Sequence, residues 1–231
     1  MRKKLPSVTL LGLDCINIDR LIQAAEICKK DFEFAEVKLL TSLPSSHPDV
    51  IQIPPVSSTE AYSHFMVHTL DHYVDTEHVL IVQYDGFILN PQAWTDDFLL
   101  YDYIGAPWWK HEKLIVGNGG FCMRSKKLVH MLATDPDIPE IPKGEPEDVY
   151  ICRELRDLLE SKGIHFAPVD VARKFSIEMN EVVGGTWTDQ FGFHGLRWTD
   201  IGNWLLKNPE YKIDNTLVEK VVDGRIVKVE K

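Results

Sequence analysis

The stretch Val8-Thr9-Leu10-Leu11-Gly12-Leu13 decides the fold. It is a nearly continuous apolar run, which is typical of a strand buried on both faces at the centre of a parallel sheet. A second such run, Val79–Tyr84, ends directly before Asp85-Gly86. Two buried strands of this kind predict an open α/β sheet whose strand ends can carry a ligand site.

Helical patterns alternate with strand patterns through the first half of the chain. We expect further strands at 34–40, 50–53, 103–106 and 115–123, the last with a glycine-rich turn inside it. We expect helices at about 17–30, 58–74, 93–100, 125–134, 147–162 and 198–206, with strand and loop from 165 to 195. This alternation predicts an α/β fold with a mixed, mostly parallel central sheet flanked by helices. A hairpin is expected over Leu217–Val229, turning at Asp223-Gly224.

Composition narrows the class of protein. The chain has 231 residues, 44% of them hydrophobic and 26% charged, with a formal net charge of −10. This acidic balance argues against sequence-independent nucleic-acid binding, so we expect no nucleic-acid partner. No run approaches the roughly 20 apolar residues of a membrane span. The four cysteines have no metal-binding or disulfide spacing and predict reduced thiols in a cytoplasmic protein.

Asp85 is the first candidate for chemistry. A carboxylate directly after a buried strand points into the crevice where ligands of open α/β sheets bind, and Gly86 permits close approach of a ligand. Mg²⁺ or Mn²⁺ accepts such an oxygen ligand and bridges to substrate phosphates. The alternative interpretation is a simple Asp-Gly turn.

Three other segments can join such a site. Gly117-Asn118-Gly119-Gly120-Phe121 can expose backbone N–H groups to a ligand, or it can be a bulged hairpin. Glu147-Asp148 begins a helix, where acidic residues are favoured by the helix dipole and where a carboxylate can also act as a general base. Asp148 is our candidate base and Glu147 the reserve. His194 stands between glycines and aromatics, either as a hydrogen-bonded core or surface residue or as an exposed ligand.

Two further groups of residues are weaker candidates for a functional site. His64, His68 and His72 follow one another at every fourth position, with Asp71 and Asp75 on nearly the same helical face. They form either a zinc site or, as we expect, a solvated face, because no HExxH glutamate accompanies them. Trp108 and Trp109 can stack on a sugar or fill the core.

These segments together resemble a family of uncharacterised glycosyltransferase-like proteins with the GT-A fold. The matching stretches occur in one order between about residues 80 and 195. They are Gln83-Tyr84-Asp85-Gly86, Tyr103-Ile104-Gly105-Ala106-Pro107-Trp108, Gly117-Asn118-Gly119-Gly120-Phe121, Glu147-Asp148-Val149, Phe175-Ser176-Ile177-Glu178 and Phe191-Gly192-Phe193-His194-Gly195.

The resemblance implies one GT-A-like domain over residues 1–231, with a nucleotide-binding half at about 1–90. A donor-sugar and acceptor half would follow at about 91–210, and a C-terminal hairpin at 211–231. Asp85 and His194 would bind the metal, and Asp148 or Glu147 would act as the base. The nucleotide would contact Leu13, Asp14, Tyr84, Gly86 and Arg124, and the sugar and acceptor would contact Trp108, Trp109, Asn118, Gly119, Gly120 and Phe121.

The implied function is a metal-assisted, inverting transfer of a sugar from a nucleotide sugar to an acceptor hydroxyl, in glycan or polysaccharide synthesis. UDP-sugars are the favoured donors and GDP-sugars the second choice, with Mn²⁺ or Mg²⁺ as the cofactor. Phe87 stands where the fold's usual second aspartate would be, so one carboxylate and His194 would carry the ion. Two alternatives are a non-catalytic nucleotide- or carbohydrate-binding module and a nucleotidyltransferase, although the loop after Val8–Leu13 lacks the glycine-rich, basic character of the latter.

Overall fold

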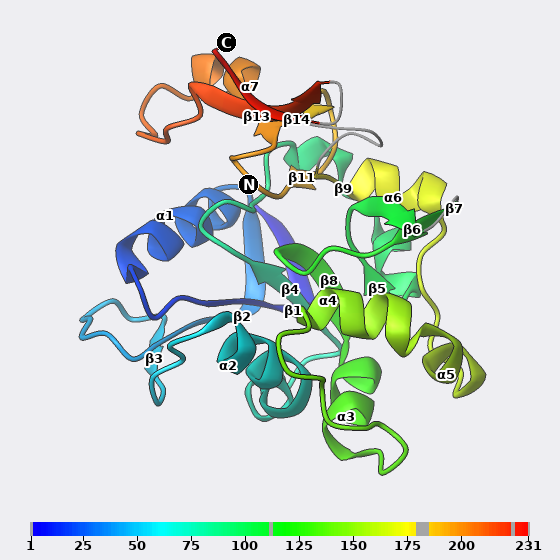
Figure 1. Ribbon diagram of the computed structural model, residues 1–231. Coiled ribbons are helices and arrows are strands. Elements are labelled where there is room, and N and C mark those ends of the chain that lie inside the picture. Colours follow the sequence, from blue (N-terminus) through cyan, green and yellow to red (C-terminus); the bar gives the residue numbers. More distant parts are fainter. Residues whose placement is uncertain (1, 111–112, 179–184, 223–224, 231) are drawn as a thin grey trace.

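A six-stranded mixed sheet forms the centre of the molecule, as the computed structural model of residues 2–110, 113–178, 185–222 and 225–230 shows (Figure 1). The strand order is β3-β2-β1-β4-β8-β5, with parallel pairing from β3 to β4 and antiparallel pairing of β8 with both its neighbours. The strands are β1 (Lys3–Leu13), β2 (Phe32–Thr41), β3 (Val50–Gln52), β4 (His78–Val82), β5 (Tyr103–Ile104) and β8 (Phe121–Ser125). The predicted mixed, mostly parallel α/β sheet is confirmed.

Helices cover both faces of this sheet. Figure 1 shows α1 (Ile18–Lys29) on one side and α2 (Thr59–His64) and α3 (Lys126–Thr134) on the other. Each begins at a polar residue whose side chain accepts a backbone N–H of the first turn, which satisfies an otherwise unpaired donor. Asn17 caps α1, Ser58 caps α2 and Ser125 caps α3. The predicted starts of these helices are therefore correct.

Two predicted long helices are instead segmented. The first continues from α2 as a π-helical turn, η1 (Phe65–Thr69), and a 3₁₀ turn, η2 (Leu70–Tyr73). The second runs through α4 (Glu147–Val149), the π-helical η5 (Tyr150–Glu154) and α5 (Arg156–Ser161) before Gly163, whose φ is +80°. A π-turn contains one extra residue and leaves carbonyls free for other partners. In η1 the Met66 carbonyl accepts a hydrogen bond from Arg124 at 3.3 Å.

Other boundaries also differ from the expectations. The helix expected at 93–100 is two 3₁₀ turns, η3 (Pro91–Ala93) and η4 (Asp96–Leu100), because Thr95 caps a new turn between them. The region expected as strand and loop after His165 contains α6 (Val169–Phe175), and α7 (Gly202–Lys207) begins later than predicted. The strand expected at 115–123 is split into two strands that belong to different sheets.

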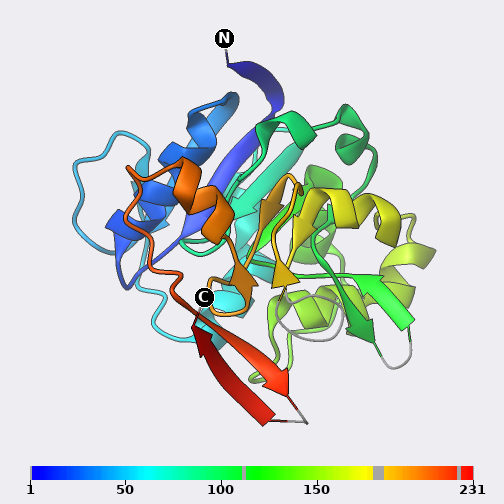
Figure 2. The ribbon, with the colours of Figure 1, turned by 90° about the horizontal axis from the view of Figure 1, so that it is seen from above.

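Short two-stranded sheets complete the structure. They pair β6 (Pro107–Lys110) with β7 (Lys113–Val116), β9 (Ser176–Ile177) with β11 (Gly192–Phe193), and β10 (Gly185–Thr186) with β12 (Thr199–Asp200). The predicted C-terminal hairpin is present as β13 (Leu217–Val222) and β14 (Arg225–Glu230), and Figure 2 shows it projecting at the edge of the molecule. Its expected turn at Asp223-Gly224 lies outside the described residues. All four cysteines are free thiols.

An aromatic cluster packs the segment before His194 against the sheet. The Phe191 ring is fully buried, and its centroid lies 5.2–6.0 Å from those of five neighbouring rings. These rings come from strand, turn and helix segments between residues 32 and 175, namely Phe32, Trp94, Phe98, Phe121 and Phe175. The cluster therefore fixes the C-terminal part of the chain on the N-terminal sheet.

We predict that Phe191→Ala lowers the free energy of unfolding by about 3–5 kcal/mol, because a large buried ring leaves a cavity that its neighbours cannot fill. Urea denaturation measures this change. Leu206→Ala is the control, since Leu206 is 82% exposed, and it should change stability by no more than about 0.5 kcal/mol. Equal effects of the two substitutions would contradict the assignment of this cluster as core.

Candidate functional site

A cleft of about 480 Å³ opens at the carboxyl ends of β1 and β4. In open α/β sheets, ligands bind where the connections from two adjacent strands leave in opposite directions, and this cleft lies at such a point. Its walls come from the segments that follow β1 and β4, the start of α2, residues 117–121 (the glycine loop) and the start of α4. The lining residues include Leu13, Asp14, Arg20, Tyr62, Gln83, Tyr84, Gly119, Gly120, Glu147, Asp148 and His194.

Asp85 and His194, which are 109 positions apart in sequence, lie side by side at the end of β4. His194 lines the cleft, whereas Asp85 contacts His194 but is not among the lining residues. The Asp85 Oδ1 atom lies 3.7 Å from His194 Nε2, and the Gly195 N–H donates to the Asp85 carbonyl at 2.8 Å. Asp85 Oδ1 is buried and accepts no hydrogen bond from the described residues. The pairing on which the predicted metal site depends is therefore present.

His194 is held by contacts on both ring nitrogens. Nδ1 lies 3.0 Å from a Glu178 carboxylate oxygen, and Nε2 lies 3.3 Å from Gln83 Oε1. Asn118 Nδ2 also lies 2.9 Å from Nδ1, but the charge-assisted bond to Glu178 is the stronger of the two. Nδ1 therefore donates to Glu178 and Nε2 faces Asp85. Glu178 belongs to one of the stretches that carry the family resemblance, Phe175-Ser176-Ile177-Glu178, but no local sequence pattern identified it as the partner of His194.

The glycine loop closes over the same ring. A Cβ atom on Gly120 would lie 2.0 Å from His194 Nε2, and one on Gly119 would lie 2.0 Å from Glu147 Oε1. Asn118 adopts a positive φ of 63° and accepts the Phe121 N–H at its side chain, which fixes the turn. Both glycines are therefore required by close approach of the backbone to site residues.

His194 carries a positive charge at neutral pH in the absence of metal. Burial lowers the pKa of its imidazole, but the hydrogen bond and charge of Glu178, with the charges of Asp85 and Asp148, outweigh burial and raise the pKa to about 9. Three carboxylates thus surround one imidazolium.

The two acidic residues at the start of α4 have different partners. Asp148 Oδ2 accepts the Gly119 N–H at 3.0 Å and lines the cleft. Burial, with the charge of Glu178, raises the pKa of Asp148 despite this hydrogen bond. Glu147 Oε1 lies 3.2 Å from the Arg124 guanidinium, and burial with the charge of Asp148 raises its pKa to about 7 even so. Asp148 is thus the better placed of the two as a base.

Arg124 does not reach the cleft, contrary to its predicted role in nucleotide binding. Its side chain is 0% exposed and donates to the Met66 carbonyl and to Glu147. An arginine with no exposed surface cannot touch a ligand in the cleft, and its charge is paired with a buried carboxylate. The burial of Arg124 results from its position on β8 in the central sheet and not from its neighbours in sequence.

Arg20, which sequence reasoning missed, lines the cleft beside Asp14 and Tyr84. Its guanidinium carbon lies 3.7 Å from the Tyr84 ring centroid, and its Nε donates to Asp14 Oδ2 at 2.6 Å. Asp14 Oδ1 also accepts the N–H groups of Ile16 and Asn17. The predicted residues Leu13, Asp14 and Tyr84 line the cleft here, and Arg20 supplies a cation beside them.

Most of the predicted sugar and acceptor contacts, and the predicted nucleotide contact Gly86, do not line the cleft. Trp108 packs on Gly117, where a Cβ would lie 1.9 Å from its ring, and the Arg153 guanidinium lies 4.7 Å from its centroid. Phe121 is fully buried and Asn118 is 2% exposed. Gly86 lies under the glycine loop, where a Cβ would be 2.8 Å from the Gly120 carbonyl. The Trp109 side chain lies outside the described part of the structure. Of this set, Gly119 and Gly120 line the cleft.

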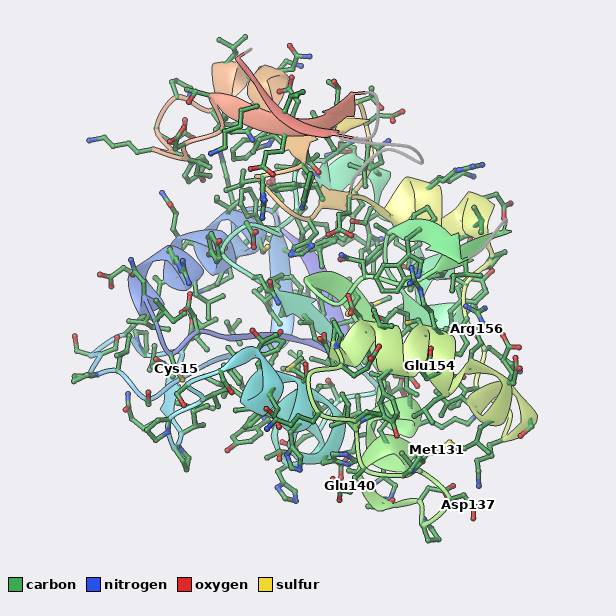
Figure 3. The ribbon with its side chains drawn as sticks, in the orientation of Figure 1. Cys15, Met131, Asp137, Glu140, Glu154 and Arg156 are labelled. Atoms are coloured by element: carbon green, nitrogen blue, oxygen red, sulfur yellow. The ribbon has the colours of Figure 1, made fainter. Side chains whose placement is uncertain are left out.

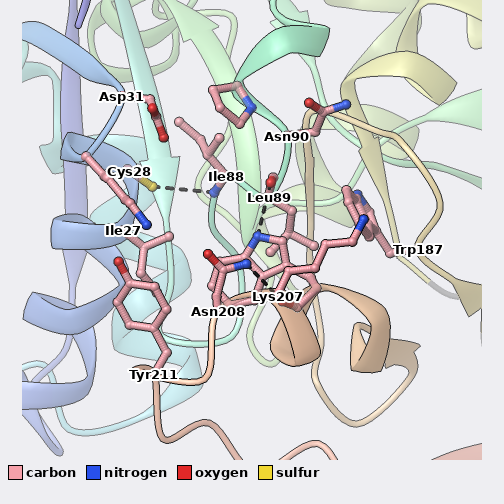
Figure 4. Close-up of a pocket in the computed structure, with 13 residues that line it drawn as sticks. Ile27, Cys28, Asp31, Ile88, Leu89, Asn90, Trp187, Lys207, Asn208 and Tyr211 are labelled. Carbon is pink, nitrogen blue, oxygen red and sulfur yellow. Dashed lines mark hydrogen bonds between the residues drawn. The ribbon is translucent and has the colours of Figure 1, made fainter. Parts of the chain in front are cut away.

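A separate cavity of about 270 Å³ lies between α1 and α7 (Figure 4). Its lining includes Cys28, Asn90, Trp187, Lys207 and Tyr211, and none of the predicted site residues. The Trp204 indole N–H donates to the Leu89 carbonyl at its floor. This cavity is remote from the carboxylates and the histidine described above.

Comparison with known proteins gives a family match that covers most of this site. Residues 49–194 match the family described as "Protein of unknown function (DUF5672)". The chain belongs to this family. The matched segment includes Asp85, the glycine loop, Glu147-Asp148 and His194, but not Asp14 or Arg20. No curated protein matches the chain. Among the described residues, no helix combines the length and apolar character that crossing a bilayer requires.

We predict that His194 stabilises the metal-free fold in a pH-dependent manner. Its folded pKa of about 9 exceeds the usual value of about 6.5, so its contribution is complete below pH 6.5 and is lost as the pH rises through 9. Relative to His194→Gln, the wild-type protein should lose on the order of 3 kcal/mol of unfolding free energy across this window. Urea denaturation in EDTA at several pH values measures this loss. If the unfolding free energies of the two proteins changed with pH in parallel, the assignment of a charged His194 would be refuted.

Proposed function

We propose that this protein is a GT-A-type glycosyltransferase that uses a nucleotide sugar as donor in the cleft between β1, β4 and the glycine loop. The observation that carries the proposal is that Asp148 and His194, from distant segments, line one cleft, and that Asp85 lies 3.7 Å from His194. Polar groups that gather in one cleft, with shifted pKa values, are typical of a site for chemistry.

The charge balance of the cleft supports a cation as part of the site. Arg20 forms an ion pair with Asp14, and Arg124 is buried against Glu147 and does not reach the cleft, so neither arginine offers a free charge to a ligand. Asp85, Asp148 and Glu178 then face one His194 imidazolium. An anionic diphosphate would be repelled by this surplus of carboxylates unless a cation accompanied it.

The residues at Asp85 and His194 fit a divalent ion. Two ligand atoms on one ion lie at most about 4.2 Å apart, since each bond is about 2.1 Å, and Asp85 Oδ1 and His194 Nε2 are separated by 3.7 Å. Glu178 on Nδ1 orients the imidazole as outer-shell carboxylates do for metal-binding histidines. Bound Mn²⁺ or Mg²⁺ would supply positive charge for a leaving nucleoside diphosphate.

Phe87 explains why a second carboxylate is missing from this set. Its side chain is fully buried, and its ring centroid lies 4.9 Å from that of Phe193 in an edge-to-face contact. The position that would carry the second aspartate therefore supports the strand next to His194. His194 would thus be the second protein ligand to the ion.

Asp148 is the base in this proposal. Its Oδ2 is oriented by the Gly119 N–H, and its raised pKa brings it closer to the value that suits proton transfer near neutral pH. The acceptor hydroxyl would give its proton to the Asp148 carboxylate while its oxygen bonds to the anomeric carbon. The bond from that carbon to the diphosphate oxygen breaks on the opposite face, which inverts the configuration.

Donor binding provides the first test of this proposal. In a thermal-shift panel of UDP-, GDP- and CMP-sugars, each with Mn²⁺ or with EDTA, we expect a UDP-sugar with Mn²⁺ to raise the melting temperature, because a ligand that binds only the folded state stabilises it. The corresponding mixtures with EDTA should give smaller shifts. Absence of a shift with every donor would count against a nucleotide-sugar site.

The second test is catalytic. We predict that Asp148→Asn lowers the rate of sugar transfer, or of donor hydrolysis, by about 10²–10⁴-fold, as loss of a general base does. Asp157→Asn on exposed α5 is the matched control and should retain the wild-type rate. Unchanged turnover of the Asp148 variant would exclude it as the base. Donor binding without turnover in the wild-type protein would instead favour a non-catalytic binding module.

A further inference from the structure

A second set of metal-ligating side chains lies on the other side of the α2–η1 helical segment. His64 ends α2, His68 lies in the π-helical η1, and Glu140 lies on the loop that follows α3. Figure 3 labels Glu140 near the lower edge of the molecule, beside this helical segment. These residues line no part of the cleft described above, so the inference goes beyond the proposed function.

The spacing of the three ligand atoms suits tetrahedral coordination. Glu140 Oε2 lies 3.6 Å from His64 Nε2 and 3.5 Å from His68 Nε2, and the two imidazole centroids are 4.9 Å apart. Ligand atoms about 2.0–2.1 Å from a tetrahedral Zn²⁺ are about 3.3 Å from one another. The carboxylate thus lies at nearly the required distance from both imidazoles.

His68 presents an unsatisfied nitrogen to this cluster. Its Nε2 atom is buried and has no hydrogen-bond partner among the described residues. The Leu132 backbone lies within reach of the same ring. Metal-binding histidines characteristically donate their other ring N–H to a carbonyl or carboxylate. A buried nitrogen without a partner is costly unless a ligand satisfies it.

Other candidate metal-binding groups among the described residues lack an unpaired ligand atom of this kind. Glu26, His47 and Asp49 also lie close together, but Lys29 already donates to both carboxylates at 2.7 and 2.6 Å. A cation there would have to displace a lysine. His72, the third member of the predicted histidine series, is exposed and lies outside the cluster. The expected solvated histidine face is therefore wrong for His68, which is only 16% exposed.

We propose that His64, His68 and Glu140 form a zinc-class metal site whose fourth ligand is water. Two imidazoles and one carboxylate select Zn²⁺ over Mg²⁺, which prefers oxygen ligands. The ion would tie the α2–η1 segment to the loop between α3 and α4. That loop leads directly into Glu147 and Asp148, so the metal would restrain the approach to the cleft.

Metal binding by tag-free, EDTA-treated protein tests the proposal. We expect the wild-type chain to bind Zn²⁺ in titration calorimetry and to give the visible spectrum of tetrahedral Co²⁺. His68→Ala and Glu140→Gln should each weaken Zn²⁺ binding by at least about tenfold, the range seen even for outer-shell changes. Glu140 is 83% exposed, so its substitution leaves the fold intact.

Two controls separate this site from the others. His72→Ala, in the same helical segment, should bind Zn²⁺ as tightly as wild type. His194→Ala should also retain the zinc site, because His194 belongs to the cleft. Zn²⁺ should raise the melting temperature of both controls more than that of Glu140→Gln. Wild-type Zn²⁺ affinity in Glu140→Gln and His68→Ala, or loss of zinc in His194→Ala alone, would overturn the proposal.

Discussion

The buried ion pair between Arg124 and Glu147 is the contact on which the site depends. Arg124 lies on β8 in the central sheet, and its guanidinium reaches both the Met66 carbonyl in η1 and Glu147 at the start of α4. One side chain thus connects the sheet with the two helical segments that flank the cleft. A charge with no exposed surface is costly to leave unpaired, so removal of either partner would be strongly destabilising. The pair therefore fixes where α4 begins, and with it the position of Asp148.

The same contact shows what sequence reasoning could and could not predict. Apolar runs identified β1 and β4, and the rule that ligands bind beyond strand ends singled out Asp85. Its pairing with His194, which lies 3.7 Å away, was implied only by the resemblance. Arg124 was misassigned because its neighbours in sequence resemble a ligand-binding loop, whereas its burial results from contacts with η1 and α4. Arg20 and Glu178 were missed for a related reason. Their partners, Tyr84 and His194, are 64 and 16 positions away, and no local spacing encodes such contacts.

Two of the errors in secondary structure have a common physical origin. Periodicity in the segments 58–74 and 147–162 indicated helices, but both contain a π-turn. Hydrophobic periodicity cannot distinguish α-helical from π-helical bonding, because one added residue shifts the apolar pattern only slightly. In η1 the deviation has a local benefit, since Met66 offers its carbonyl to Arg124.

The excess of carboxylates around His194 links the electrostatics of the cleft to its proposed chemistry. Glu178, Asp85 and Asp148 raise the pKa of His194 to about 9, so an ion that binds Nε2 must first displace a proton. A divalent cation is attracted by the same three carboxylates. The imidazolium would repel it, but binding of the cation to Nε2 displaces the proton and so removes that positive charge. A nucleoside diphosphate arriving alone meets net negative charge, whereas one arriving with the cation does not. On the proposed function, donor and metal should therefore bind as one unit, with mutual strengthening of their affinities.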